Sequence, residues 1–514
     1  MVAQQKKNTI LAVKGNCFSF LKMHWFLVVL LCFLLGSCTS PSKPKQPNFL
    51  IILIDDLGKE WISAYGASEI NTPNIDLLAA SGIKFNRAYS MPQCTPSRVA
   101  LVTGQYPYTN GWINHYDVPR WGHGVNFDTQ KNPAFANELK KAGYKTCVAG
   151  KWQINDFRIE PDAMQKAGFD EFCMWTGYES SNPISESRYW DPYIHTKEGS
   201  KTYHGQFGPD IFSDFIIDFL RENKEHPMCV YYPMVLTHTP FVHTPFEPGV
   251  TTIFEKHRAM VRYTDHIIGK IVEALEEMDI MDNTYLILTT DNGTTSSIIG
   301  KRDTAYVRGG KTFLSENGIN APFIARTPNG KTGETEALVD FTDIYPTLLD
   351  LANIENRNLL NIDGVSFADV LRGNLNNGKR EWALSMGGLP AVLSADTLLQ
   401  NRFVFRDRVI CSQHYKAYVD TLKQVVRIFD MQEDPYETNN LIDEANVKDE
   451  LARFNTILEL IPERDNNPVY TRIQNSGGDI PLTQLQNLVR RRDRSNLLPL
   501  ANEEAFLKLK NSNK

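Results

Sequence analysis

The chain has 514 residues, of which 42% are hydrophobic and 22% charged, and its formal net charge is −6. This is an ordinary globular composition with enough chain for a large core, which excludes fibrous and wholly disordered classes. Nucleic-acid binders usually have a basic face, and the negative net charge gives no sign of one, so we expect no nucleic-acid partner. The cysteines beyond residue 40 are irregularly spaced and predict neither a zinc pattern nor a disulfide framework.

The N-terminal segment has the features of an export signal. Four lysines precede an unbroken apolar run over residues 25–35, which is short for a membrane span and typical of a signal-peptide core. The run ends in Leu35-Gly36-Ser37-Cys38, which resembles a bacterial lipobox, whose cysteine is lipidated after cleavage. We therefore expect a lipoprotein signal peptide over 1–37, lipidation of Cys38 and a polar tether over 38–47. A plain transmembrane anchor is the alternative. The protein would be a bacterial cell-envelope lipoprotein, periplasmic or anchored in the outer membrane by its lipid alone.

Predicted strands and helices alternate along the next 300 residues. The continuous apolar run at 49–54 is typical of a strand buried on both faces, and a second apolar run lies at 228–236. Further strands are predicted at 145–149, 285–289 and 321–326. Helix-start signals and helical spacing predict helices from residue 71, from residue 94, and over 134–142, 210–222, 263–278 and 343–351. Residues 169–208 show little periodicity and are predicted to be an inserted loop region. This order favours an α/β fold with a large, mostly parallel sheet flanked by helices.

A smaller unit is predicted at the C-terminal end. A polar run with glycine over residues 372–379 marks the boundary. Short strand candidates follow at 391–393, 402–406, 415–419 and 427–430, and a helix is predicted over 447–460. We expect a first domain over 48–375, a C-terminal subdomain over 380–470 with an antiparallel sheet and one helix, and a C-terminal extension over 471–514.

The stretch from Cys94 to Gly104 predicts the start of a helix, with Cys94 at its N-terminus. Pro96 suits a first turn, and Arg98 lies one turn beyond Cys94 on the same helix face. Backbone N–H groups and the helix dipole favour anionic oxygen at such an end, so an anionic ester could lie between the two side chains. The alternative is that Cys94 is a small buried thiol without a chemical role.

Four of the predicted strands are followed by charged or hydrogen-bonding residues: Asp55-Asp56, Lys151, His238 and Asp291-Asn292. Open α/β sheets bind ligands beyond the carboxyl ends of their strands, so we expect these residues to meet at one edge. Three carboxylates and an amide oxygen are hard ligands that suit calcium, and less well magnesium, while a ligand set for zinc is missing. A turn or a helix cap is the alternative role for each pair taken alone.

The residues Cys94–Gly104 resemble the Cys-x-Pro-Ser-Arg-x-x-Leu-x-Thr-Gly element of the type I sulfatases, of the alkaline phosphatase superfamily. In that family a formylglycine-generating enzyme oxidises the cysteine to formylglycine (3-oxoalanine), whose hydrate is the nucleophile. The resemblance implies that 48–375 is the catalytic domain and that one Ca2+ is bound by Asp55, Asp56, Asp291, Asn292 and an oxygen of the modified Cys94. Through the motifs Gly150-Lys151-Trp152, His238-Thr239-Pro240 and Gly310-Lys311, it also implies the catalytic residues Cys94, Arg98, Lys151, His238 and Lys311.

The chain departs from the family pattern at Gln153, where the usual motif is Gly-Lys-Trp-His. Glutamine can orient a hydroxyl by hydrogen bonding, but it cannot take up a proton near neutral pH. We place Gln153 with His115, Arg120 and Trp190 as candidate substrate-binding residues, because aromatic and cationic loop residues stack on sugars and pair with acidic groups.

Three functions are consistent with these patterns. The first hypothesis is a lipid-anchored sulfatase that hydrolyses a sulfate ester on a sulfated carbohydrate. The second is a phosphonate or phosphate ester hydrolase of the same superfamily, because related formylglycine enzymes cleave those esters. The third is a non-catalytic lipoprotein that binds sulfated glycans, and Gln153 is the residue that motivates it.

Overall fold

The computed structural model describes residues 46–113, 125–155, 157, 160–176, 187–328, 330–355, 361–373, 378–388, 391–393, 399–401, 403–472 and 500–512. Within it, Pro47–Lys514 form one compact unit. The predicted signal peptide, Cys38, His115 and Arg120 lie outside the described residues. None of the described helices combines the length and the apolar character that crossing a bilayer requires.

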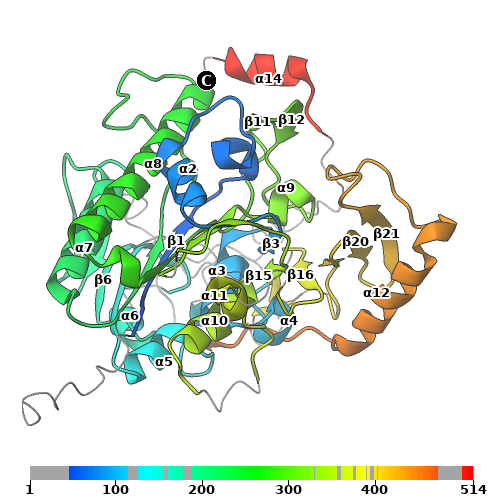
Figure 1. Ribbon diagram of the computed structural model, residues 1–514, viewed down its shortest axis with the longest axis horizontal. Coiled ribbons are helices and arrows are strands. Elements are labelled where there is room, and N and C mark those ends of the chain that lie inside the picture. Colours follow the sequence, from blue (N-terminus) through cyan, green and yellow to red (C-terminus); the bar gives the residue numbers. More distant parts are fainter. Residues whose placement is uncertain are drawn as a thin grey trace, which may run out of the picture. The chain divides into compact units, whose positions relative to one another are not determined.

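A ten-stranded sheet has the order β14-β2-β13-β10-β1-β9-β5-β6-β7-β8. Its strands β1 and β6 are labelled in Figure 1. The five central strands β10, β1, β9, β5 and β6 are parallel to one another, and antiparallel pairs lie at both sides of them. This confirms the predicted α/β class. The strands are β1 (Asn48–Ile54), β2 (Ile83–Phe85), β5 (Lys145–Lys151), β6 (Glu171–Trp175), β7 (Tyr193–Thr196), β8 (Gly199–Thr202), β9 (Met228–Pro233), β10 (Thr284–Thr290), β13 (Phe323–Arg326) and β14 (Gly333–Thr335).

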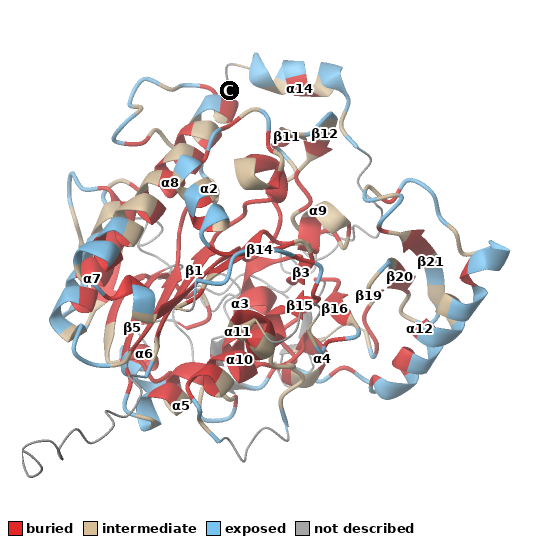
Figure 2. Cartoon of the chain, viewed as in Figure 1, coloured by how far each residue is buried: buried red, intermediate tan, exposed pale blue. Residues whose placement is uncertain are grey.

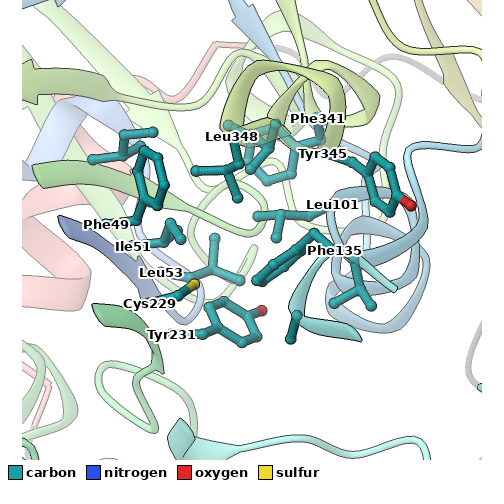
Figure 3. Close-up of a cluster of buried hydrophobic side chains, with 14 of the residues drawn as sticks. Phe49, Ile51, Leu53, Leu101, Phe135, Cys229, Tyr231, Phe341, Tyr345 and Leu348 are labelled. Atoms are coloured by element: carbon teal, nitrogen blue, oxygen red, sulfur yellow. The ribbon is translucent and has the colours of Figure 1, made fainter. Parts of the chain in front are cut away.

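Helices cover both faces of this sheet, and every residue of β1 is buried between them. Alternate side chains of a strand point to opposite faces. Phe49, Ile51 and Leu53 therefore belong to one core, shown in Figure 3 with Leu101 and Phe135 from the helices. The helices of this core are α3 (Cys94–Thr103), α5 (Phe135–Lys141), α6 (Ala163–Lys166), α10 (Ile344–Leu351) and α11 (Ala368–Arg372).

The intervening residues of β1, Leu50, Ile52 and Ile54, enter a second core on the opposite face. The helices there are α2 (Pro73–Ala80), α7 (Gly208–Asn223), α8 (Ile253–Glu277) and, near the C-terminus, α14 (Glu503–Lys510). Figure 2 shows the result, with buried strands at the centre and helices such as α7 exposed only along their outer surfaces.

A four-stranded antiparallel sheet with one helix follows the large sheet in sequence, as predicted. Its order is β16 (Ala383–Met386), β19 (Arg408–Cys411), β20 (Tyr415–Val419) and β21 (Val425–Asp430), and α12 (Lys448–Leu460) packs on β21 (Figure 1). The remaining pairs are β11 (Ile299–Arg302) with β12 (Ala305–Arg308), β3 (Ala88–Tyr89) with β15 (Val339–Asp340), β17 (Ala391–Leu393) with β18 (Leu399–Asn401), and β4 (Val125–Phe127) with β22 (Tyr470–Arg472). Two short helices are α4 (Pro107–Asn110) and α9 (Glu316–Ile319), and 3-10 turns lie at Lys59–Trp61, Ser63–Tyr65, Met281–Asn283, Phe341–Asp343 and Ala445–Val447.

Two predictions of local structure are wrong. Residues 169–208 are not simply a loop region, because they contain β6, β7 and β8 of the large sheet. The alternation of β6 between the two cores lasts only five residues, too few to stand out in sequence. Of the strand predicted over 402–406, the described residues 403–406 are not a strand either. The backbone N–H of Arg406 donates to a carboxylate oxygen of Asp465 at 2.7 Å instead of a neighbouring strand.

Candidate active site

The strand ends that the sequence singled out belong to adjacent strands. β10, β1, β9 and β5 are consecutive in the sheet, and Ile54 pairs in register with Thr290. The carboxylates of Asp55 and Asp291, one residue further along each strand, therefore lie side by side. Asp55, Asp56, Asp291 and Asn292 are all at most 2% exposed.

Helix α3 points its N-terminus at this edge, with Cys94 as its first residue. The hydroxyl of Ser97 donates to the backbone carbonyl of Asp291 at 2.5 Å, which fastens the first turn of α3 to the end of β10. The guanidinium of Arg98 donates through Nε and Nη2 to Oδ2 of Asp291 at 3.1 and 2.7 Å. Its Nη1 donates to the carbonyl of Lys151 at 2.7 Å, so one arginine braces the ends of β10 and β5.

Two lysines neutralise the paired aspartates. Nζ of Lys151 lies 2.6 Å from Oδ2 of Asp55, and Nζ of Lys311 lies 2.6 Å from Oδ2 of Asp56. Nε2 of His238 approaches the same Asp56 oxygen at 3.6 Å. Residues from distant parts of the sequence thus form one buried cluster of three carboxylates and three permanent cations.

This cluster also fits a divalent cation. Ligand atoms of Asp55, Cys94 and Asp291 lie within 4.8 Å of one another. Among the described residues, Oδ1 of Asp55 and Oδ1 of Asn292 are buried without a hydrogen-bond partner. The Asn292 amide nitrogen donates to Oδ1 of Asp56 at 2.8 Å, which fixes the orientation of its carbonyl oxygen. Buried oxygens without donors are costly, and oxygen-binding cations such as Ca2+ or Mg2+ would satisfy them.

The charges at this edge control ionisation of the cysteine and histidine. Burial raises the pKa of the Cys94 thiol, although Lys151 and Lys311 oppose the effect. Burial lowers the pKa of His238 well below its usual range, and the charges of Lys311 and Lys151 add to this. Cys94 is therefore a neutral thiol and His238 a neutral imidazole in this arrangement.

The pKa values of three charged groups around Cys94 and His238 are shifted as well. Burial opposes ionisation of Asp55, but the charges of Lys151, Arg98 and Lys311 outweigh it and hold the pKa of Asp55 below its usual range. Burial and the adjacent Asp55 carboxylate raise the pKa of Asp291. Burial opposes the charge of Lys311, but Asp56 dominates and raises the pKa of Lys311 above its usual value, so that this lysine stays charged.

The hydrogen bonds of His238 define its tautomer. Nδ1 lies 2.6 Å from the carbonyl of Thr239, an acceptor, so Nδ1 carries the proton and Nε2 faces the cluster. The backbone N–H of Thr237 donates to the carbonyl of Asp55 at 2.6 Å, and Tyr189 Oη donates to the carbonyl of His238 at 2.5 Å. The histidine is thus held from both sides.

Unusual backbone geometry also occurs at this edge of the sheet. Asp56, Gln153 and Thr312 have positive φ angles of 60°, 70° and 77°. Such conformations are costly for residues other than glycine and are typical of functional sites. Gly150 has φ +116°, and a Cβ atom there would lie 2.1 Å from the carbonyl oxygen of Pro233. A glycine is therefore required directly before Lys151.

The remaining candidates are distributed differently. Gln153 is half-buried just beyond the end of β5. Trp190 packs against Phe207 and His243, at ring-centroid distances of 4.9 and 5.1 Å, and donates from Nε1 to the carbonyl of His243 at 3.1 Å.

Sequence reasoning missed the supporting residues Thr237 and Thr294. The hydroxyl of Thr294 accepts from the backbone N–H of Gly58 at 2.8 Å, which holds the chain after Asp56. Only their closeness in sequence to His238 and Asn292 could have indicated them.

A large, mostly parallel sheet with a buried cluster of acidic and basic side chains at the carboxyl ends of its strands is the arrangement expected of an α/β enzyme that binds an anionic ligand. The sulfatase family profile matches residues 47–354, and a profile described as N-sulphoglucosamine sulphohydrolase, C-terminal, matches residues 309–463. The chain therefore belongs to the sulfatase family, which confirms the resemblance found in the sequence.

Relatives and a solved structure agree with this assignment. Human N-acetylgalactosamine-6-sulfatase is 30% identical over 360 residues, which cover 64% of this chain and 66% of the relative. An N-acetylgalactosamine-6-O-sulfatase of Bacteroides thetaiotaomicron is 29% identical over 416 residues, covering 65% of this chain and 80% of the relative. The crystal structure of Ps i-CgsB has the same fold, with a TM-score of 0.68 and 23% identity over 88% of this chain and 100% of that one.

Proposed function

We propose that this protein is a sulfatase that hydrolyses a sulfate ester on a sulfated carbohydrate, with formylglycine made from Cys94 as the nucleophile and one Ca2+ in the strand-end cluster. The observation that carries the proposal is the position of Cys94. Its sulfur lies within 4.8 Å of ligand oxygens of Asp55 and Asp291, at the N-terminus of a helix that also presents Arg98. The sulfur atom of Cys94 therefore lies both beside the candidate metal-binding cluster and at a helix N-terminus, which attracts anions.

Both implied groups have residues that fit them. Asp55, Asp56, Asp291 and Asn292 would hold Ca2+, and two of their oxygens are buried without donors among the described residues. When bound, Ca2+ supplies positive charge beside the attacked sulfur, and formylglycine supplies an oxygen nucleophile as its hydrate. Maturation would require a formylglycine-generating enzyme as a partner.

The cations of the site would bind and orient the sulfate group. Arg98, Lys151 and Lys311 are buried or nearly so, and fixed charges in a dry site stabilise developing negative charge far better than mobile ones in water. Lys311 keeps its proton because its pKa is raised, so it can donate from Nζ to the ester oxygen that leaves. His238 presents an unprotonated Nε2 to the same region, so it would accept a hydrogen bond there, and it would be the second candidate for this proton transfer only after taking up a proton at Nε2.

Gln153 stands where the usual family motif has a histidine, so this position cannot take up a proton in the proposed reaction. It lies in the position that follows Trp152, with a positive φ angle of 70° that turns the chain at the end of β5. An amide donates and accepts hydrogen bonds without titrating, so Gln153 would orient the nucleophile or the sugar without removing a proton.

The proposed substrate class comes from the relatives. Two of them are named N-acetylgalactosamine-6-sulfatases, so 6-sulfated N-acetylhexosamines are the first substrates to test. The predicted lipobox at Cys38 adds the proposal that the enzyme acts at the bacterial cell envelope, on glycans reached from the membrane surface.

The test has two parts. Mass spectrometry of the peptide that spans Cys94, from protein purified out of its native host, should show an aldehyde in place of the thiol. Sulfate release should then be measured on a panel of sulfated mono- and oligosaccharides, with phosphate esters of the same alcohols in parallel.

Faster release of phosphate than of sulfate would favour the phosphate or phosphonate ester hydrolase instead. Binding of sulfated glycans without any release would favour the non-catalytic binding protein. Unmodified Cys94 in an active preparation would overturn the assignment of the nucleophile.

A further inference from the structure

A further cation, Arg188, lies beside the strand-end cluster, against the end of the neighbouring strand β6. The guanidinium carbon of Arg188 is 3.9 Å from the ring centroid of Trp175. Trp175 is the last residue of β6 and pairs in register with Lys151, the last residue of β5. Arg188 therefore lies at the same carboxyl edge of the sheet as the cluster, one strand further along.

The segment that carries Arg188 is held firmly. The next residue, Tyr189, donates from Oη to the carbonyls of Val235 and His238 at 2.8 and 2.5 Å. Its own carbonyl accepts from the backbone N–H of Gly208 at 2.6 Å. The same segment therefore positions both Arg188 and His238.

Arg188 is a buried charge that lacks polar partners among the described residues. It is 7% exposed, and its Nε and Nη1 have no hydrogen-bond partner there. A buried guanidinium without a carboxylate is costly, because the protein replaces none of the hydration that it removes. Stacking on an indole ring recovers only part of that loss. The arrangement becomes favourable when an anion supplies the missing acceptors.

We propose that Arg188 is a substrate-binding residue that pairs with a second anionic group of the substrate, a sulfate or a carboxylate, next to the sulfate that is cleaved. The inference rests on the proposed sulfatase function and adds a substrate class to it: sugars or disaccharides that carry at least two negative charges. A planar guanidinium fixed over an aromatic ring can bind either group through two parallel N–H bonds.

The experiment compares three substrates and three variants. The substrates are N-acetylgalactosamine 6-sulfate, N-acetylgalactosamine 4,6-disulfate, and a disaccharide that joins a uronic acid to N-acetylgalactosamine 6-sulfate. The variants are Arg188→Gln, Arg188→Lys and the matched control Arg221→Gln, an exposed arginine on α7 that pairs only with Asp218 in the described structure. The readout is kcat and KM for sulfate release.

We expect the wild type to prefer one of the two doubly charged substrates, and the preferred one identifies the second group as sulfate or carboxylate. Arg188→Gln should lower kcat/KM for that substrate about 10- to 100-fold, mainly through KM, and change it less than about threefold for the 6-sulfate. Arg188→Lys should restore part of the loss, because it keeps the charge. Arg221→Gln should match the wild type.

Equal losses on all three substrates would show that Arg188 only supports the fold, and no loss on any would show that it does not meet the substrate. Either result overturns the inference while the sulfatase proposal stands. If the wild type releases sulfate neither from these three substrates nor from any member of a wider panel, the proposed sulfatase function itself fails. The failure of the Arg188 inference and the failure of the proposed function are therefore distinguishable.

Discussion

Two of the buried ion-pair networks among the described residues, the Arg380 network and the strand-end cluster, are arranged in opposite ways. Near the junction with the antiparallel sheet, Arg380 donates from Nε to Asp343 at 2.7 Å and from Nη1 to the Tyr106 hydroxyl and the Trp382 carbonyl, both at 2.9 Å. Its Nη2 donates to Asp343 and to the carbonyl of Asp363. The guanidinium is thus surrounded by acceptors.

The strand-end cluster contains similar groups but leaves them incomplete. Oδ1 of Asp55 and Oδ1 of Asn292 have no donor among the described residues, and Asp56 is held at a positive φ angle. The Arg380 network uses its hydrogen bonds to fasten the cap of α10 to the later chain. The cluster keeps oxygen atoms and strained backbone available for a ligand. Between these two networks, the difference lies in how completely the hydrogen bonds are satisfied, and not in burial or charge.

The largest expected effect separates the two regions by chemistry. Cys94→Ala should lower kcat for sulfate release by at least about 1,000-fold, because the nucleophile is lost. The unfolding midpoint should change little, because Cys94 makes no ion pair in the described structure. Sulfate assays and thermal unfolding of the same preparation check both. Residual activity within tenfold of the wild type would contradict the role of Cys94.

Breaking the satisfied network should have the reverse outcome. Arg380→Met leaves the buried Asp343 without its partner, which typically costs about 3–5 kcal/mol of unfolding free energy. Activity per folded molecule should persist. The matched control is Arg372→Met, whose partner Asp350 is 40% exposed, and it should cost less than about 1 kcal/mol. Urea unfolding measures both, and equal losses would contradict the distinction drawn here.

Calcium should stabilise the incomplete cluster and leave the complete one unaffected. At 100 times its dissociation constant, Ca2+ should raise the unfolding free energy by about 2.7 kcal/mol. Asp55→Asn should reduce this calcium-induced increase, whereas Asp282→Asn, at a side chain 90% exposed, should preserve it. Thermal unfolding with CaCl2, with MgCl2 and with a chelator measures the increase. A shift of the same size in both variants would mean that Ca2+ binds elsewhere.

How much of this could be predicted from sequence differs between the two regions. The strand-end cluster could be located because its residues directly follow apolar runs, and the ends of parallel strands converge by geometry. Cys94 and Arg98 could be placed on one helix face because their spacing is local. The Arg380 network left no comparable signal, since Arg380, Asp343 and Tyr106 are joined only by the tertiary fold.

Short elements and supporting residues escaped prediction for related reasons. β6 alternates between two cores over only five residues, so its pattern was lost among neighbouring aromatic residues. Helix α8 begins at Ile253, ten residues before the predicted start, through a capping box of Thr252 and Glu255 that was overlooked. Arg188 could be named from the sequence as a cationic loop residue suited to acidic groups, but the lack of hydrogen-bond partners at its Nε and Nη1 among the described residues could not be read from the sequence.

A third kind of buried polar residue, His257, sharpens the comparison through pH. It is fully buried between Trp61 and Phe241, and neither ring nitrogen has a hydrogen-bond partner among the described residues. Unlike the cluster, it avoids the cost of a buried charge by staying neutral: burial lowers the pKa of His257 to about 3. The unfolded chain takes up a proton below the ordinary pKa of about 6.5, whereas the folded protein does not.

The sign of the effect follows from this difference. Above about pH 6.5 the folded and unfolded states bind the same number of protons at His257, and its contribution to the unfolding free energy is complete. As the pH falls from 6.5 toward 3, only the unfolded chain takes up this proton, so the unfolding free energy decreases by about 1.4 kcal/mol per pH unit. His257→Phe should remove about 2 kcal/mol of the loss between pH 7 and pH 5, whereas His226→Phe, at an exposed position, should leave the slope unchanged. Urea unfolding at pH 7, 6 and 5 measures the slopes. An unaltered slope in His257→Phe would mean that this histidine is protonated in the folded protein, and that a charge can be buried here without partners.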